Sequence, residues 1–161
     1  MLKFKDLYES YAEEVYRFAF WLAGNRFDAE DITSETFIRA WVRSKKIHTE
    51  TLKAYLFTIA RNVYLDQQRK TKRQVVLEDV YLDPAPAIDK KIELQHEIKE
   101  IQSFLQNLPE IDRAAFVLYV QHELPYEEIS RVLELSLSAV KIKIHRVRKK
   151  LIAARLNQEV N

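Results

Sequence analysis

The chain of 161 residues has no cysteine, one glycine and four prolines. Without cysteine it can form neither a disulfide framework nor a thiolate metal site. No uninterrupted apolar run approaches the roughly 18 residues of a membrane-spanning helix, and the first residues lack the apolar core of a signal peptide. We therefore expect a cytoplasmic protein without membrane insertion. So little glycine and so few alternating segments favour an all-α fold.

Charge is plentiful, with 26 Lys and Arg against 24 Asp and Glu, and it is segregated along the chain. Residues 93–134 carry 3 basic and 9 acidic residues, whereas residues 135–161 carry 7 basic and 1 acidic. This segregation suggests several different partners, because each segment presents its own field.

The last basic segment predicts an amphipathic helix. Val140, Ile144 and Val147 form one apolar stripe at helical spacing, and Ser136 stands where an N-cap would. The preceding segment 125–133 predicts a short partner helix, so the pair is typical of a helix-turn-helix whose second helix enters the major groove. A solvated basic helix packed on a bundle is the alternative interpretation. The positions that face outward by helical angle are Ser138, Ala139, Lys141, Ile142, His145, Arg146 and Lys149.

The N-terminal half predicts three helices. Apolar stripes indicate one helix over about 4–23 and another from Asp28, acting as an acidic cap, to about Trp41. A polar, basic loop over 43–51 separates them from a third helix that starts near Leu52. The second helix carries a face that is either a small docking patch or an ordinary solvated surface with one stray apolar residue. That face comprises Asp31, Glu35, Ile38 and Arg39.

The third helix carries cations and aromatic rings off its apolar stripe. Phe57 and Tyr64 are predicted to lie on the side of Arg61 and Asn62. Rings that stack on bases, beside cations that follow phosphates, suit single-stranded nucleic acid. The alternative is that Phe57 and Tyr64 pack against the first helix.

Two small helical domains joined by a linker follow from this pattern. We predict domain 1–73, linker 74–92 and domain 93–161, because Pro84 and Pro86 cannot lie within a helix. Glu93 and His96 match one Glu-x-x-His half-site of helical di-iron proteins. A second copy and two further glutamates are needed, and no second copy is found, so a di-metal enzyme is a remote alternative.

Four segments, in order and suitably spaced, resemble the extracytoplasmic-function (ECF) group of bacterial sigma factors in the sigma-70 family. Residues 28–41 resemble its "AED…ETF.RAW" segment, and residues 56–69 resemble "L..IARN…D..R". Residues 108–113 resemble the start of the family's second domain, and residues 128–148 resemble its helix-turn-helix. The resemblance covers nearly the whole chain.

The resemblance implies a promoter-specificity subunit that has no cofactor, no metal and no catalysis of its own. Its partners would be core RNA polymerase (the beta-prime clamp helices and the beta flap), promoter DNA and an anti-sigma factor. The patch of Asp31, Glu35, Ile38 and Arg39 would dock on the clamp helices, and the basic helix would read the minus-thirty-five element. The residues implied to capture the minus-ten strand are Arg43, Lys45, Lys46, Arg61, Asn62, Arg69 and Lys70. A stand-alone helix-turn-helix regulator is the second candidate.

Two residues depart from the family pattern. Glu134 occupies a turn position where the family often has glycine, so we expect strain or an altered turn there. Ile142 stands where a small polar residue is usual on the reading face. It would either contact thymine methyl groups or mark an unusual promoter preference.

Overall fold

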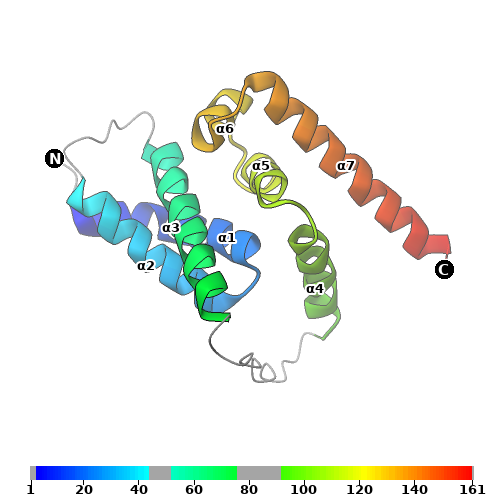
Figure 1. Ribbon diagram of the computed structural model, residues 1–161, viewed down its shortest axis with the longest axis horizontal. Coiled ribbons are helices and arrows are strands. Elements are labelled where there is room, and N and C mark those ends of the chain that lie inside the picture. The colour runs from blue at the N-terminus through cyan, green and yellow to red at the C-terminus, as the bar shows by residue number, and fades with distance from the viewer. Residues whose placement is uncertain (1–2, 44–51, 76–91, 161) are drawn as a thin grey trace.

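The computed structural model describes residues 3–43, 52–75 and 92–160 of the chain. Within these ranges every regular element is an α-helix (Figure 1), which confirms the predicted fold class. In chain order the helices are α1 (Phe4–Ala23), α2 (Arg26–Val42), α3 (Leu52–Val75), α4 (Ile92–Gln106), α5 (Glu110–Val120), α6 (Tyr126–Leu133) and α7 (Leu137–Val160).

The turn between α1 and α2 is closed by the single glycine. Gly24 has φ +87° and its N–H donates to the Phe20 carbonyl at 2.8 Å, which ends α1 as predicted. Asn25 caps α2, because its Oδ1 accepts from the Asp28 N–H at 2.8 Å. The predicted start at Asp28 is therefore wrong: Asn25 already satisfies a first-turn N–H, so the helix begins at Arg26.

Helices α1, α2 and α3 pack together as an N-terminal group. The apolar stripe predicted for the first helix enters this core through Leu7, Val15, Phe18 and Leu22, whereas Phe4 and Tyr8 near the start of α1 stay exposed. Phe18 meets Phe57 of α3 edge-on at 5.1 Å between ring centroids. The fully buried large side chains of the group are Val15, Phe18, Leu22, Ile32, Phe37, Leu56, Phe57 and Val63.

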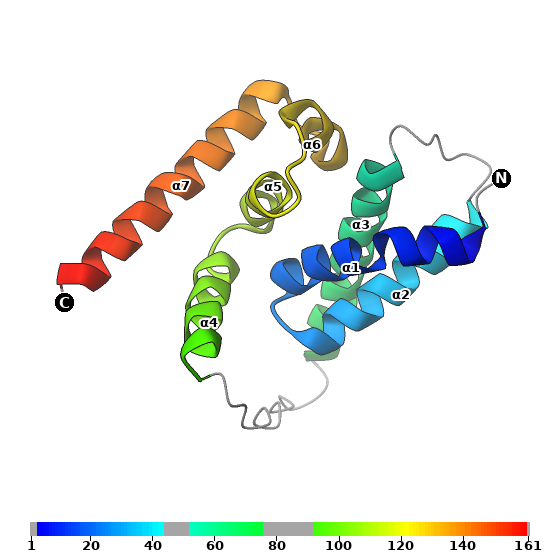
Figure 2. The same ribbon diagram turned by 180° about the vertical axis from the view of Figure 1, so that it is seen from behind.

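Helices α4 to α7 form a C-terminal group around α5. The predicted stripe of Val140, Ile144 and Val147 is buried and packs α7 against α5 and α6. Helix α7 runs along the side of this group that lies away from α2 (Figure 2). The Ser136 hydroxyl accepts from the Ala139 N–H at 3.1 Å, which confirms the predicted N-cap.

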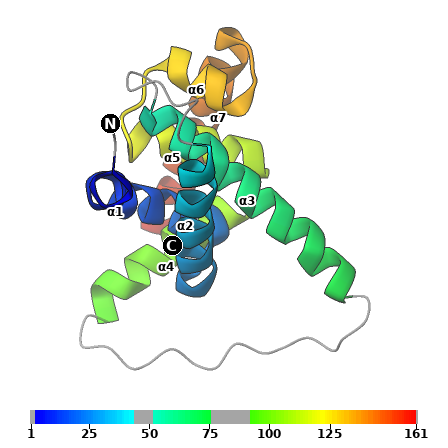
Figure 3. The same cartoon turned by 90° about the vertical axis from the view of Figure 1, so that its left-hand side faces the viewer.

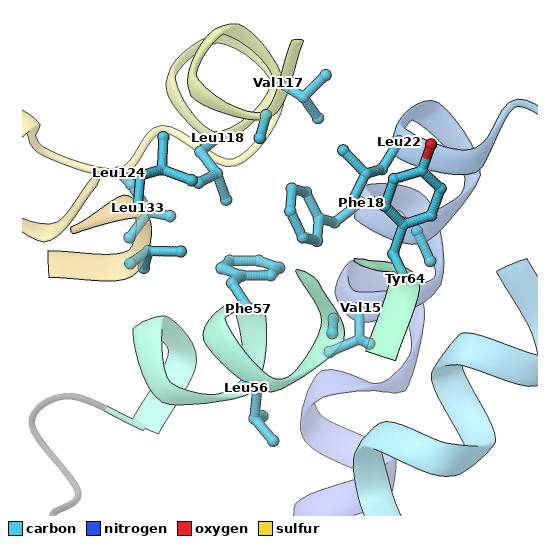
Figure 4. Close-up of a cluster of buried hydrophobic side chains, with 14 of the residues drawn as sticks. Val15, Phe18, Leu22, Leu56, Phe57, Tyr64, Val117, Leu118, Leu124 and Leu133 are labelled. Carbon is cyan, nitrogen blue, oxygen red and sulfur yellow. The ribbon is translucent and has the colours of Figure 1, made fainter. Parts of the chain in front are cut away.

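The two groups share one apolar core. Helix α3 packs against α6, and α1 packs against α4 and α5. Phe57 reaches from α3 toward Leu118, Leu124 and Leu133 of the other group (Figure 4). Figure 3 shows that the C-terminal end of α3 and the N-terminal end of α4 diverge from this core. Most of the predicted linker lies outside the described residues.

The shared core corrects one expectation about α3. Phe57 has no exposed surface and Tyr64 is 6% exposed, so neither ring can stack on a base in this structure. Phe57 packs against the first helix, as the alternative predicted, but residues more than fifty positions later complete its burial. A helical stripe alone does not reveal such a distant layer.

Candidate nucleic-acid interface

The predicted reading face of α7 is exposed. Helix α7 is anchored by its buried stripe, so the opposite side projects into solvent. Ile142 is 50% exposed, although it is an apolar residue flanked by lysines. The predicted positions on this face are all solvent-accessible, Ala139 partly and the others openly: Ser138, Ala139, Lys141, Ile142, His145, Arg146 and Lys149.

Two other cations of α7 contact side chains of the C-terminal group, although Arg148 stays exposed. The Lys143 ammonium donates to Asp112 Oδ1 of α5 at 3.0 Å. The Arg148 guanidinium lies 5.1 Å from the centroid of the Tyr119 ring, and Tyr119 itself stacks on Tyr126 at 4.9 Å. These contacts fix the rotation of α7 about its axis and leave the outward cations facing solvent. The basic run alone gave no sign of this division.

The turn before α7 is strained, as the departure at Glu134 predicted. Glu134 adopts φ +54° and ψ +46°, the left-handed conformation that costs a non-glycine residue about 1–2 kcal/mol. The Leu135 N–H donates to the Ser130 carbonyl at 3.1 Å, and the Ser130 hydroxyl donates to the Leu135 carbonyl. These bonds hold the short link between α6 and α7 in place.

The strand-capture residues predicted on α3 fall into two sets. Asn62, Arg69 and Lys70 are exposed, and Arg43 is exposed at the end of α2. Lys45 and Lys46 lie outside the described residues. Arg61 differs from the exposed set, because its Nε and Nη2 donate to the two carboxylate oxygens of Glu110 at 2.7 and 2.9 Å. The structure therefore directs Arg61 into the contact between the two groups.

The predicted docking patch on α2 is exposed and electrostatically linked to α3. Ile38 is 55% exposed and Asp31, two turns earlier on the same helix, is also exposed, whereas Glu35 and Arg39 are half-buried. The Arg39 guanidinium donates to Glu35 at 3.0 Å and to Asp66 of α3 at 3.3 Å. Its hydrogen bond to Glu35 is the main cause that raises the pKa of Arg39.

Asp66 is a structural partner that the sequence argument did not single out. It also accepts from Arg69 at 3.2 Å, so one carboxylate joins the docking patch to the strand-capture surface. Its position within the family-like segment was the available signal.

The side chain of Glu93, half of the metal half-site, lies outside the described part of the structure. Among the residues whose side chains are described, no three His, Cys, Asp or Glu gather as a metal site would require. His96 lies beside Glu100, with Nε2 and Oε1 3.0 Å apart. Across residues 3–43, 52–75 and 92–160, no helix has the length and apolar character to cross a membrane.

Comparison with known proteins decides the family. Residues 7–74 match the profile described as Sigma-70 region 2, and residues 98–151 match Sigma-70, region 4. The ECF RNA polymerase sigma factor SigM of Bacillus subtilis is 33% identical over 159 residues, which cover 97% of this chain and 96% of SigM. The chain belongs to the ECF sigma factors of the sigma-70 family.

Other members of the sigma-70 family are similarly related. The ECF RNA polymerase sigma factor SigE of Mycolicibacterium smegmatis is 37% identical over 158 residues, covering 94% of this chain and 61% of SigE. The chain therefore spans less than two thirds of that relative. A solved complex of the sigma factor RpoE with the anti-sigma factor NepR from Bartonella quintana is also similar. Its likeness has a TM-score of 0.74 at 26% identity and covers 92% of this chain and 93% of that one.

Proposed function

We propose that this ECF sigma factor binds core RNA polymerase and directs it to promoters by gripping two forms of DNA. The observation that carries the proposal is the presence, on one chain, of two separate polar surfaces with different geometry. One is the regular outward face of α7, and the other is the cluster of Asn62, Arg69 and Lys70 on α3. A regulator that binds duplex DNA alone would need the first surface and not the second.

In this proposal α7 lies in the major groove at the minus-thirty-five element. Arg146 and Lys149 follow phosphates or guanine edges, and a good bidentate contact discriminates against a wrong base by about 1–3 kcal/mol. Within the described residues neither side chain forms an ion pair, so no internal bond must break before DNA is bound. Ile142, one turn before Arg146 on the same face, is suited to a thymine methyl group.

Helix α3 would capture the unpaired minus-ten strand. Extruding a base from the duplex costs a few kcal/mol, so the strand must be held by compensating contacts. The Asn62 amide can donate to and accept from a base edge, whereas Arg69 and Lys70 can hold phosphates. Arg43, Lys45 and Lys46 would extend the same surface. Arg61 would join it after release from Glu110.

The patch of Asp31, Glu35, Ile38 and Arg39 is the proposed docking face for the beta-prime clamp helices of core polymerase. An exposed isoleucine ringed by charges has the form of a small interface with an apolar centre and a polar rim. The beta flap would be a second contact, made by the C-terminal group. Acting with polymerase, the chain would work in the cytoplasm and perform no catalysis itself.

An anti-sigma factor is the proposed regulatory partner. The relative from Bartonella quintana was solved with one, and its likeness extends over both groups of this chain rather than one alone. A protein that holds this arrangement of α1–α3 and α4–α7 would keep the two DNA surfaces from reaching a promoter together.

The decisive experiment is transcription in vitro with the purified chain, core polymerase and a library of genomic fragments, followed by start-site mapping. We expect defined start sites that core polymerase lacks alone. Arg146→Glu should abolish most of them, whereas Arg155→Glu, an equal charge change farther along α7, should leave them. If the chain and core polymerase never associate, the proposed function is wrong.

A further inference from the structure

The contact between Arg61 and Glu110 has the geometry of a bound phosphate. Two parallel N–H donors of one guanidinium meet two oxygens of one anion, at 2.7 and 2.9 Å. Arginine uses the same planar fork for carboxylates and for phosphates. The pair is also sheltered, since the two side chains are 16% and 21% exposed. It is therefore better defined than an ordinary surface ion pair, which is solvated and mobile.

Neighbouring contacts hold Glu110 against Arg61. Glu110 lies in the first turn of α5, and Arg113 one turn later donates to the Tyr64 hydroxyl of α3 at 3.0 Å. After α5, His122 packs on Phe57 with 4.6 Å between ring centroids. The Glu110 carboxylate thus reaches Arg61 only while α5 is packed on α3, and the bond to Arg61 is lost when α5 separates from α3.

This arrangement has a direct consequence for strand capture. The Arg61 donors that would bind a phosphate oxygen are already occupied while α5 is seated, and Asn62, the next residue, remains exposed. We propose that Glu110 is an internal competitor for the promoter strand, occupying Arg61 until the C-terminal group separates from α3. The proposal rests on the function proposed above, since it assumes that α3 meets a single strand.

The competition concerns one surface of the chain. Arg69 and Lys70 are exposed, so some strand binding persists in the seated form. The outward face of α7 lies on the other side of the C-terminal group, so duplex binding should not depend on Glu110. If the ion pair were purely structural, the expected result would differ: removing Glu110 would weaken the fold and would not raise the affinity for a single strand.

The test measures binding of a fluorescent mixed-sequence single-stranded 20-mer to the full chain by anisotropy, across a range of salt concentrations. Glu110→Gln keeps the side-chain shape and removes the charge. We expect its affinity to rise at least about fivefold, the lower end of usual intramolecular couplings. The logarithm of affinity should also fall more steeply with the logarithm of salt, by about 0.7, which is the signature of one added phosphate contact on a single strand.

Two controls separate this effect from general electrostatics. Glu127→Gln removes one exposed acid from α6. It should not give the fivefold rise in affinity for the 20-mer, and it should leave the salt dependence of that affinity unchanged. The double variant Glu110→Gln with Arg61→Ala should lose the gain, because the added contact is made by Arg61. Glu110→Asp, which keeps the charge on a shorter stem, provides a milder variant and should give a smaller gain. Circular dichroism verifies folding of each.

The proposal is overturned if Glu110→Gln binds the 20-mer no more tightly than Glu127→Gln does. It is also overturned if the double variant with Arg61→Ala keeps the gain in affinity. Failure of the broader function would look different. In that case the wild-type chain would give no start-site selection with core polymerase, whether or not Glu110→Gln tightens binding to the 20-mer.

Discussion

His122 should make the contact between the two groups sensitive to acid. Its side chain is 5% exposed and packs against both Phe57 and Phe18, with ring centroids 4.6 and 6.0 Å away. Burial, assisted by the nearby cations Lys53 and Arg17, lowers the pKa of His122 to about 4. Each of these cations has its own carboxylate partner: Lys53 pairs with Glu14 at 3.2 Å, and Arg17 pairs with Glu13. The His122 Nε2 itself has no hydrogen-bond partner among the described residues.

The direction of the effect follows from where the proton binds. When His122 reaches solvent its pKa returns to about 6.5, so protons bind the separated or unfolded chain more tightly than the packed one. Stability is therefore complete above about pH 6.5 and falls as the pH drops toward 4. The difference of about 2.5 pKa units corresponds to roughly 3 kcal/mol in total, of which about 2 kcal/mol is lost between pH 7 and pH 5.

Urea unfolding at pH 7 and pH 5, followed by tryptophan fluorescence, measures this loss. His122→Phe preserves an aromatic side chain against the two phenylalanines and should remove the loss of about 2 kcal/mol between pH 7 and pH 5. His145→Gln, at an exposed position on α7, should retain it. Equal pH dependence in wild type and His122→Phe would refute the assignment to this imidazole.

Three further predictions concern single positions. Gly24→Ala should lower the free energy of unfolding by about 1–2 kcal/mol, because an alanine there is left-handed and its Cβ would lie 2.8 Å from Gln106 Nε2. Gln106→Ala in the same chain should recover the steric part, and chemical denaturation measures both. Glu134→Gly should raise the free energy of unfolding by about 0.5–1 kcal/mol in thermal unfolding, since glycine relieves the strain at φ +54°. Glu123 has the same φ, so Glu123→Gly should raise the free energy of unfolding by a similar amount. Asn62→Ala should leave duplex binding unchanged yet reduce open-complex yield in permanganate footprinting, and a normal yield would contradict the strand-capture role.

Helix positions were predictable because each helix carries its own apolar stripe. The bounds of the helix over residues 4–23 and the start of the helix near Leu52 were predicted correctly, and Ser136 was recognised as a cap. The start of α2 was missed because Asn25 follows glycine and looks like part of a turn. Local signals therefore sufficed wherever the structure is stabilised by neighbours in sequence.

The contacts between the two groups could not be predicted in the same way. Helix α3 is apolar on more than one side, and sequence spacing does not say which later segment covers Phe57. Glu110 in a first turn is explained adequately by the helix dipole, so nothing local reveals its bond to Arg61. His122 likewise has the pattern of an ordinary loop residue.

The bonds across the contact suggest why the two groups can separate without unfolding. Arg113 is the most buried cation there, but two of its hydrogen bonds, both at 3.2 Å, go to the Leu105 and Leu108 carbonyls within the C-terminal group. Separation costs it one bond, that to Tyr64. The remaining polar links use side chains that water can satisfy, whereas every helix keeps its backbone ladder. Separation must also expose the apolar layer around Phe57, so it requires a partner that binds the separated groups and holds α2 and α7 apart.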